Sequence, residues 1–204
     1  MVKYDTILSM TAHWDFDEFV EMLPQEGNLL EIGSFVGKST VCWAKTFEKY
    51  QKNWSIHTVD AFAGIMSPAF YMPRKGGDLY DMTPSEKKGF LELMEPFNMD
   101  SKKQMAMFLE NIEGWDNITW EKRWLGHTKQ YVPPVKPTAM FYDGDHGYRG
   151  MKALFDSLGD TPYIFVDDCT PQFPQSIQVL EELNRPYSIN EYGIGVIHEE
   201  FFTN

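Results

Sequence analysis

Acidic residues end two apolar stretches in the second half of the sequence. Asp143 follows one of these stretches, and the pair Asp167 and Asp168 follows the next. Carboxylates that gather at one site raise one another's pKa unless a cation or hydrogen-bond donors compensate their repulsion. Mg²⁺ prefers oxygen ligands and typically takes one or two carboxylates. The three acids are therefore candidate ligands of a hard divalent cation.

A glycine turn lies much earlier, within residues 28–40. An apolar run ends at Gly33, and a second glycine, Gly37, opens a segment with helical spacing. This pattern predicts a buried parallel strand followed by a helix. Glycine lets a backbone approach a ligand closely, and the first turn of a helix offers unpaired N–H groups. The stretch is a candidate ligand site.

Glycine spacing separates the ligand classes that use such a turn. The dinucleotide pattern G-x-G-x-x-G would need glycine at Phe35 and Lys38, so it fails twice. The phosphate loop G-x-x-x-x-G-K-[ST] needs four residues between its glycines, whereas Gly33 and Gly37 enclose three. Because Lys38 and Ser39 otherwise match that loop, nucleotide binding stays open, as does a turn that only packs a helix on a sheet.

Asp60 ends the next segment with strand character, residues 55–60. An acid about 20 or more residues after such a turn can accept hydrogen bonds from both hydroxyls of a ribose. A phosphate-loop protein does not need a carboxylate there. Asp60 therefore favours a nucleoside ligand over a bare phosphate.

The glycine turn resembles the first motif of class I S-adenosylmethionine-dependent methyltransferases, most closely the small-molecule O-methyltransferase branch, on the pattern Glu31-x-Gly33-x-x-x-Gly37-x-Ser39. The resemblance implies S-adenosylmethionine as cofactor. The residues it implies as cofactor contacts are Glu31, Gly33, Ser34, Phe35, Gly37, Ser39, Asp60, His127, Thr128 and Asp143. Relatives tend to carry an acid and a serine around His127 and Thr128, so His127 departs from the pattern.

The acidic stretch resembles the same families. Asp143, Asp167 and Asp168 are similar to the Mg²⁺ ligands of catechol-type O-methyltransferases, where an acid follows the fourth strand and two acids follow the fifth. A family that includes macrolide-sugar O-methyltransferases has a signature similar to Asp143-Gly144-Asp145-His146-x-Tyr148. In the catechol type a basic residue three places after the first metal acid is the general base. The resemblance thus implies catalytic roles for Asp143 and His146, and the ordinary pKa of histidine, about 6.5, suits that role.

The function that these patterns predict is metal-assisted O-methylation of a small hydroxylated molecule. Two alternatives stay open. One is a phosphate-loop-like nucleotide hydrolase, in which Lys38 would bind phosphate and Asp167 and Asp168 would hold Mg²⁺. The other is a non-catalytic S-adenosylmethionine-binding protein on the same fold, because a fold alone does not establish function.

The elements that must position these residues follow from the apolar runs. Strands are expected near residues 28–32, 55–60, 117–120, 138–142, 162–166, 187–190 and 194–198. The predicted fold class is α/β: a Rossmann-like, doubly wound, mostly parallel seven-stranded sheet with an antiparallel last strand and helices on both faces. Right-handed crossovers bring the carboxyl ends of parallel strands to one edge, so Asp60, Asp143, Asp167 and Asp168 should gather beside the glycine turn.

Residues 1–204 are expected to form a single domain with two additions. In residues 1–27, Asp15 would cap a helix that Pro24 and Gly27 close, either packing on the domain or covering the ligand. Residues 61–99 predict an insertion, with a helix over 84–95, that walls the substrate pocket or contacts another copy in a homo-oligomer. A further helix should begin at the cap Asp100 and end at Gly114, burying an apolar stripe of Met105, Phe108, Leu109 and Ile112.

Composition limits the partners. The 204 residues carry a net charge of -12, with 30 acidic and 18 basic residues, which opposes nucleic-acid binding. No run approaches the ~20 apolar residues of a membrane span. The two cysteines, Cys42 and Cys169, stand in apolar contexts, and no basic head precedes an apolar run at the amino end. These features predict a cytoplasmic protein with a small-molecule substrate.

Overall fold

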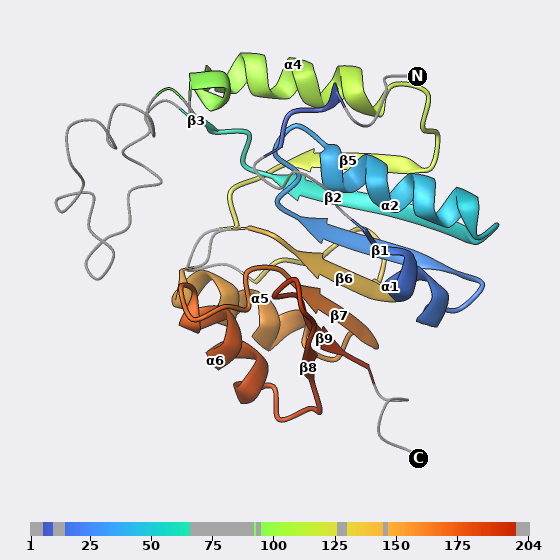
Figure 1. Ribbon diagram of the computed structural model, residues 1–204, viewed down its shortest axis with the longest axis vertical. Helices are drawn as coiled ribbons and strands as arrows, with labels where there is room; N and C mark the ends of the chain where they lie inside the picture. Colours follow the sequence, from blue (N-terminus) through green and yellow to red (C-terminus); the bar gives the residue numbers. More distant parts are fainter. Residues whose placement is uncertain are drawn as a thin grey trace, which may run out of the picture.

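A seven-stranded sheet forms the centre of the computed structural model, which describes residues 6–9, 15–65, 92, 95–125, 130–144 and 147–198 (Figure 1). Its strand order is β5-β2-β1-β6-β7-β9-β8. The first five strands in this order are parallel, and β9 runs antiparallel to both of its neighbours. The strand bounds are β1 Glu26–Ile32, β2 Asn53–Asp60, β5 Ile118–Lys122, β6 Ala139–Tyr142, β7 Tyr163–Val166, β8 Ser188–Ile189 and β9 Gly195–Ile197.

The central strands are apolar because helices cover both of their faces (Figure 1). Every residue of β6 is buried, as are the last four residues of β1. Along β6, Phe141 packs in the cluster on one face, whereas Met140 and Tyr142 pack in the cluster on the other. The predicted fold class, including the antiparallel last strand, is confirmed.

An aromatic cluster joins one face of the sheet to α1 (Asp17–Met22) and α2 (Lys38–Lys49). Trp43 of α2 is fully buried at its centre. Its ring stacks on that of Phe16 with centroids 4.0 Å apart. Phe141 and Phe165 of the sheet lie against Trp43 at 5.7 Å and 5.6 Å. This packing fixes α2, and with it the glycine turn that precedes α2.

The opposite face is covered by α5 (Tyr148–Leu158) and α6 (Pro174–Glu182). Met151 and Phe155 of α5 and Leu180 of α6 are buried in one apolar cluster with Met140 and Tyr142 of β6. The ring of Phe155 meets that of Tyr142 edge-on at 5.7 Å. Because both faces of β6 are packed, the acid that follows it, Asp143, has a fixed place at the edge of the sheet.

The helix predicted in residues 1–27 forms but differs at both ends. Its N-cap is Phe16 rather than Asp15, although the Asp15 carboxylate accepts a hydrogen bond from the Asp17 amide at 3.0 Å. Gly27 does not close the helix, because β1 begins before it, at Glu26. Phe16 and Phe19 are fully buried against the sheet, so the described part of this helix packs on the domain.

The helix after Asp100 is confirmed, but its buried face is not the predicted one. α4 (Ser101–Ile112) is capped by the Asp100 carboxylate, which accepts from the Lys103 amide at 2.8 Å. Gln104, Phe108 and Asn111 are its buried residues, whereas Leu109 is 40% exposed. The predicted stripe was right at Phe108 and, in part, at Ile112, but it was wrong at Leu109, and it missed the buried amide side chains of Gln104 and Asn111.

Only the two ends of the insertion predicted at 61–99 fall within the described residues. β3 (Gly64–Ile65) pairs antiparallel with β4 (Met99–Asp100), so the two ends lie side by side at the start of α4. A short 3-10 helix, Glu95–Phe97, precedes β4. Of the helix predicted over 84–95, the structure describes only Glu92, which is helical, and Glu95, which begins the 3-10 helix; the other residues lie outside the described ranges.

Among the helices of the described ranges, none combines the length and the apolar character that crossing a membrane requires.

Candidate functional site

The turn between β1 and α2 is held in a conformation that suits glycine. Gly33 has φ +90°, and Gly37 has φ +89°. A Cβ at Gly33 would lie 2.0 Å from the carbonyl oxygen of Asp143, far inside van der Waals contact. Gly33 is therefore needed because the backbone after β6 passes directly against the turn. Within the turn, the Gly37 amide donates to the Ser34 carbonyl at 2.7 Å.

Glu31 fastens the turn to the first residues of α2. Its fully buried carboxylate accepts hydrogen bonds from the hydroxyls of Ser39 at 2.7 Å and Thr40 at 2.5 Å. Burial raises the pKa of Glu31 to about 7, and the hydrogen bonds from Thr40 and Ser39 oppose that rise. Glu31 and Ser39, both predicted cofactor contacts, thus contact each other in the structure.

Asp60 connects the end of β2 to the same turn. Its Oδ2 accepts from the backbone amides of Ser34 at 3.0 Å and Phe35 at 2.9 Å. Its Oδ1 accepts from the Phe62 amide at 2.5 Å and from the Gln104 side-chain amide at 3.3 Å. Burial raises the pKa of Asp60, and these hydrogen bonds act against that rise. Since a carboxylate offers about four acceptor positions, the chain itself uses all of them here.

Two residues that the sequence analysis missed bind the turn from α4. The Asn111 side-chain amide donates to the Val36 carbonyl at 2.8 Å. Gln104 donates to the Phe35 carbonyl at 3.2 Å and accepts from the Gly64 amide at 2.8 Å. The signal in the sequence is an amide residue on each side of Phe108, at helical spacing along one face. Buried amides at such positions need backbone partners, and the turn supplies them.

Ser34 has a buried hydroxyl, only 2% of the residue being exposed, and among the described residues its Oγ has no hydrogen-bond partner. Phe35, the next residue, has φ +50°, and its ring lies 6.1 Å from that of Phe97. Left-handed backbone at a residue other than glycine costs free energy and concentrates at functional sites. An unpartnered buried hydroxyl on a strained turn fits a polar ligand group better than it fits a packing role.

The acids expected at the edge of the sheet do gather there. Asp143 follows β6, and its amide donates to the Ile32 carbonyl at the end of β1 at 2.8 Å. Burial raises the pKa of Asp143 well above its ordinary value, and the charges of Asp167, Asp168, Glu31 and Asp60 raise it further. Carboxylates from four strand ends therefore interact across one edge.

This edge does not form a closed metal site in the structure. Within the ranges described above, no set of three histidine, cysteine or acidic side chains is arranged to hold a metal ion. Asp168, one of the acids expected to share a cation, has φ +56°, in the left-handed region. The predicted contacts His127 and Thr128 and the predicted base His146 lie outside the described residues.

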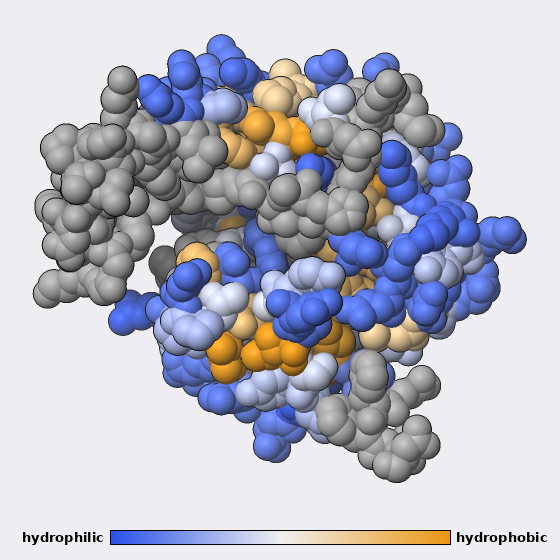
Figure 2. Space-filling model, in the orientation of Figure 1, coloured by the Kyte–Doolittle hydropathy of each residue, from blue (hydrophilic) through white to orange (hydrophobic). Residues whose placement is uncertain are grey.

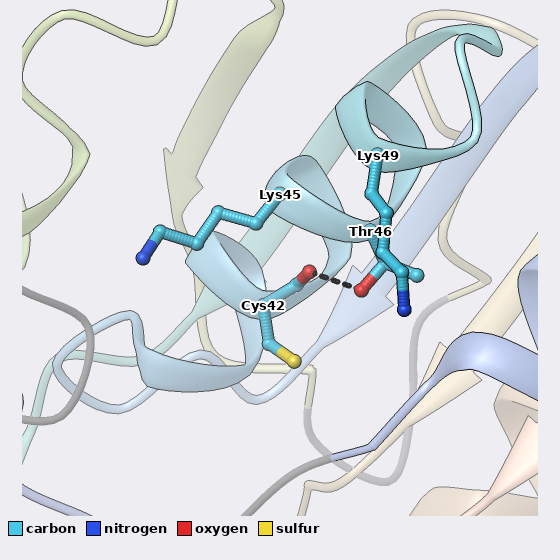
Figure 3. A pocket seen from close by; sticks show the side chains of 4 residues that line it. All are labelled: Cys42, Lys45, Thr46 and Lys49. Carbon is cyan, nitrogen blue, oxygen red and sulfur yellow. Dashed lines mark hydrogen bonds between the residues drawn. The ribbon is translucent and has the colours of Figure 1, made fainter.

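A separate hollow of about 110 Å³ lies on α2 and is lined by Cys42, Lys45, Thr46 and Lys49 (Figure 3). It is smaller than the roughly 300–1,000 Å³ of typical ligand pockets. The Thr46 hydroxyl donates to the Cys42 carbonyl of the same helix at 2.8 Å, and Lys49 pairs with Asp17. The first contact lies within α2, and the second joins α2 to α1.

The fold is similar to that of solved methyltransferases. The O-methyltransferase NovP superposes with a TM-score of 0.57 at 17% identity, over 90% of this chain and 74% of NovP. A protein of Methanococcus maripaludis assigned as an S-adenosyl-L-methionine-dependent methyltransferase superposes with a TM-score of 0.52 at 13% identity, over 90% of this chain and 82% of its own. The chain has the class I methyltransferase fold. No protein-family model and no curated sequence matches it.

Proposed function

We propose that the protein is an S-adenosylmethionine-dependent methyltransferase that methylates a hydroxyl group of a small molecule. One observation carries the proposal: the glycine turn and the acid of the next strand form a single bonded unit, because the Ser34 and Phe35 amides bind the Asp60 carboxylate. A nucleoside cofactor needs both parts together. The methyltransferase fold and the unpartnered Ser34 hydroxyl support the same assignment.

The chain's own residues would bind and orient the reactants. The turn at Gly33 would admit the methionine end of the cofactor, Asp60 would face its ribose, and His127 and Thr128 would lie near its adenine. S-adenosylmethionine supplies a reactive sulfonium methyl. His146 is proposed to take the proton of the substrate hydroxyl. Holding oxygen and methyl at close range contributes up to ~7–11 kcal/mol in well-oriented systems.

The proposal extends to a hard divalent cation at Asp143, Asp167 and Asp168. The meeting of these three carboxylates at one edge of the sheet supports it, and Mg²⁺ would lower the pKa of a hydroxyl bound beside it. Because the three side chains are not arranged as a closed ligand set, a cation would have to draw them together. No catalytic step is assigned to it.

The nucleotide-hydrolase alternative is not favoured, since NovP and the Methanococcus maripaludis protein, which share this fold, are described as methyltransferases. Thermal denaturation with S-adenosylmethionine and with ATP separates the two ligands directly. We expect stabilisation by S-adenosylmethionine and none by ATP. The reverse result would overturn the proposed function, and binding without turnover of any hydroxylated acceptor would leave the protein a cofactor binder.

Asp60→Asn tests the observation that carries the proposal. An asparagine carbonyl oxygen can still accept both turn amides, but its NH2 group then faces the Phe62 amide where the carboxylate offered an acceptor, and the negative charge that strengthens the bonds to the turn is lost. Calorimetry with S-adenosylhomocysteine should show binding weakened at least tenfold, since a hydrogen bond to a charged group is worth about 1.5–3 kcal/mol. The matched control is Asp156→Asn, which removes one exposed negative charge on α5 and should leave binding unchanged. Equal affinity in both variants would remove Asp60 from the cofactor site.

A further inference from the structure

Gln104 of α4 makes three hydrogen bonds that determine the orientation of its side-chain amide. Its Oε1 accepts from the Gly64 amide at 2.8 Å. Because that end must be the carbonyl oxygen, the Nε2 end is the donor that faces Phe35 and Asp60. Nε2 lies 3.2 Å from the Phe35 carbonyl and 3.3 Å from Asp60 Oδ1. The residue is 4% exposed, so these contacts are made away from solvent.

The four donors to Asp60 are not equivalent. Three are backbone amides, of Ser34, Phe35 and Phe62, at 2.5–3.0 Å. They cannot leave Asp60 without moving the main chain. The fourth is the Gln104 side chain, which has the longest contact of the four, at 3.3 Å. A side-chain amide can withdraw by rotating, and Nε2 has a second acceptor beside it, the Phe35 carbonyl.

We propose that Gln104 is a placeholder donor, which fills the acceptor position on Asp60 that a ribose hydroxyl takes when the cofactor binds. This inference rests on the proposed function, in which Asp60 faces the ribose. Without a ligand, Gln104 keeps the carboxylate of Asp60 fully hydrogen-bonded. With a ligand, one donor replaces another, and no buried polar group is left without a partner. Gln104 thus sets how much the ribose hydroxyls add to affinity.

The exchange has a measurable consequence for ligand choice. In the wild type a ribose hydroxyl forms a hydrogen bond to Asp60 while Gln104 loses one, so the hydroxyls add little to the binding affinity. We expect S-adenosylhomocysteine to bind no more than about threefold more tightly than its 2′,3′-dideoxy analogue. In Gln104→Met the position on Asp60 is open, and the hydroxyls gain a bond to a charged group. The preference for the ribose should then rise to about tenfold or more.

The matched control is Asn111→Met, which removes the other buried amide of α4. Asn111 also bonds the turn, but at the Val36 carbonyl and not at Asp60. Asn111→Met should weaken the binding of both ligands by the same factor and leave the ratio of their affinities at the wild-type value. A second variant, Gln104→Asn, keeps a buried amide that is one methylene too short for all three partners. It should raise the ratio as Gln104→Met does, and it covers the case in which the methionine variant does not fold.

Calorimetry with the two ligands on the four proteins decides between the interpretations. A ratio that rises in both Gln104 variants and not in Asn111→Met supports the placeholder. A ratio that falls would show that Gln104 holds Asp60 toward the ribose, and an unchanged ratio with weaker binding of both ligands would show a structural role only. Either result overturns the inference. A wild type that binds neither ligand would instead contradict the proposed function.

Discussion

Glu31→Gln should become more stable relative to the wild type as the pH rises from acidic to neutral. Glu31 is fully buried, and its pKa in the folded chain is about 7, against 4.5 ordinarily. Between these values the unfolded chain loses a proton that the folded chain keeps, so the free energy of unfolding falls as the pH rises. At 1.36 kcal/mol for each pH unit, the whole interval is worth about 3 kcal/mol.

Glu31→Gln keeps the shape of the side chain and cannot ionise, so this loss disappears. Urea denaturation of both proteins between pH 5 and 7.5, above the isoelectric point near 4.8, covers about 2 kcal/mol of the effect. The free energy of unfolding of the variant, relative to that of the wild type, should rise by this amount from pH 5 to pH 7.5. Glu26→Gln, an exposed change at the start of the same strand, should show no such rise.

A difference between Glu31→Gln and the wild type that stays constant across this interval would refute the reasoning, because it would mean that Glu31 is already ionised in the folded chain. It would also show that the Ser39 and Thr40 hydrogen bonds offset the effect of burial on the pKa of Glu31.

Three further outcomes are expected. Gly33→Ala should destabilise the chain by more than about 2 kcal/mol in urea denaturation, because a Cβ 2.0 Å from the Asp143 carbonyl at φ +90° forces the backbone apart; full stability would contradict this contact. Trp43→Ala should cost about 3–5 kcal/mol by the same measurement, since it empties the centre of the aromatic cluster; a loss under 1 kcal/mol would place Trp43 outside the core. Mg²⁺ should raise the thermal midpoint of the wild type and not of Asp167→Asn; equal shifts would exclude Asp167 as a ligand.

Figure 2 shows that hydrophobic and hydrophilic residues both reach the surface on the side of the molecule seen in Figure 1. Among the described residues, Trp124 is 61% exposed and Val132 is 76% exposed. Both lie in the connection between β5 and β6. Single exposed apolar residues are ordinary in folded proteins, so this surface adds no argument to the assignment of function.

The sequence determined the sheet and the edge at which the candidate site lies. Apolar runs that end in acids or glycine are sufficient to predict parallel strands, because a strand buried on both faces must be apolar throughout and its polar residues can stand only where it ends. The positions of Gly33, Asp60, Asp143, Asp167 and Asp168 at one edge followed from that pattern and from right-handed crossovers.

Only the tertiary structure decided how those residues are paired. Glu31 turns inward to Ser39 and Thr40, and Asp60 is occupied by the turn and by Gln104. The pairings depend on α4, which is far from the turn in the sequence, so the sequence does not indicate that the two are in contact. They also depend on backbone amides, which every residue type except proline has. A periodicity analysis assigns buried positions to apolar residues, so it passed over Gln104 and Asn111, whose burial is stabilised by hydrogen bonds to the backbone.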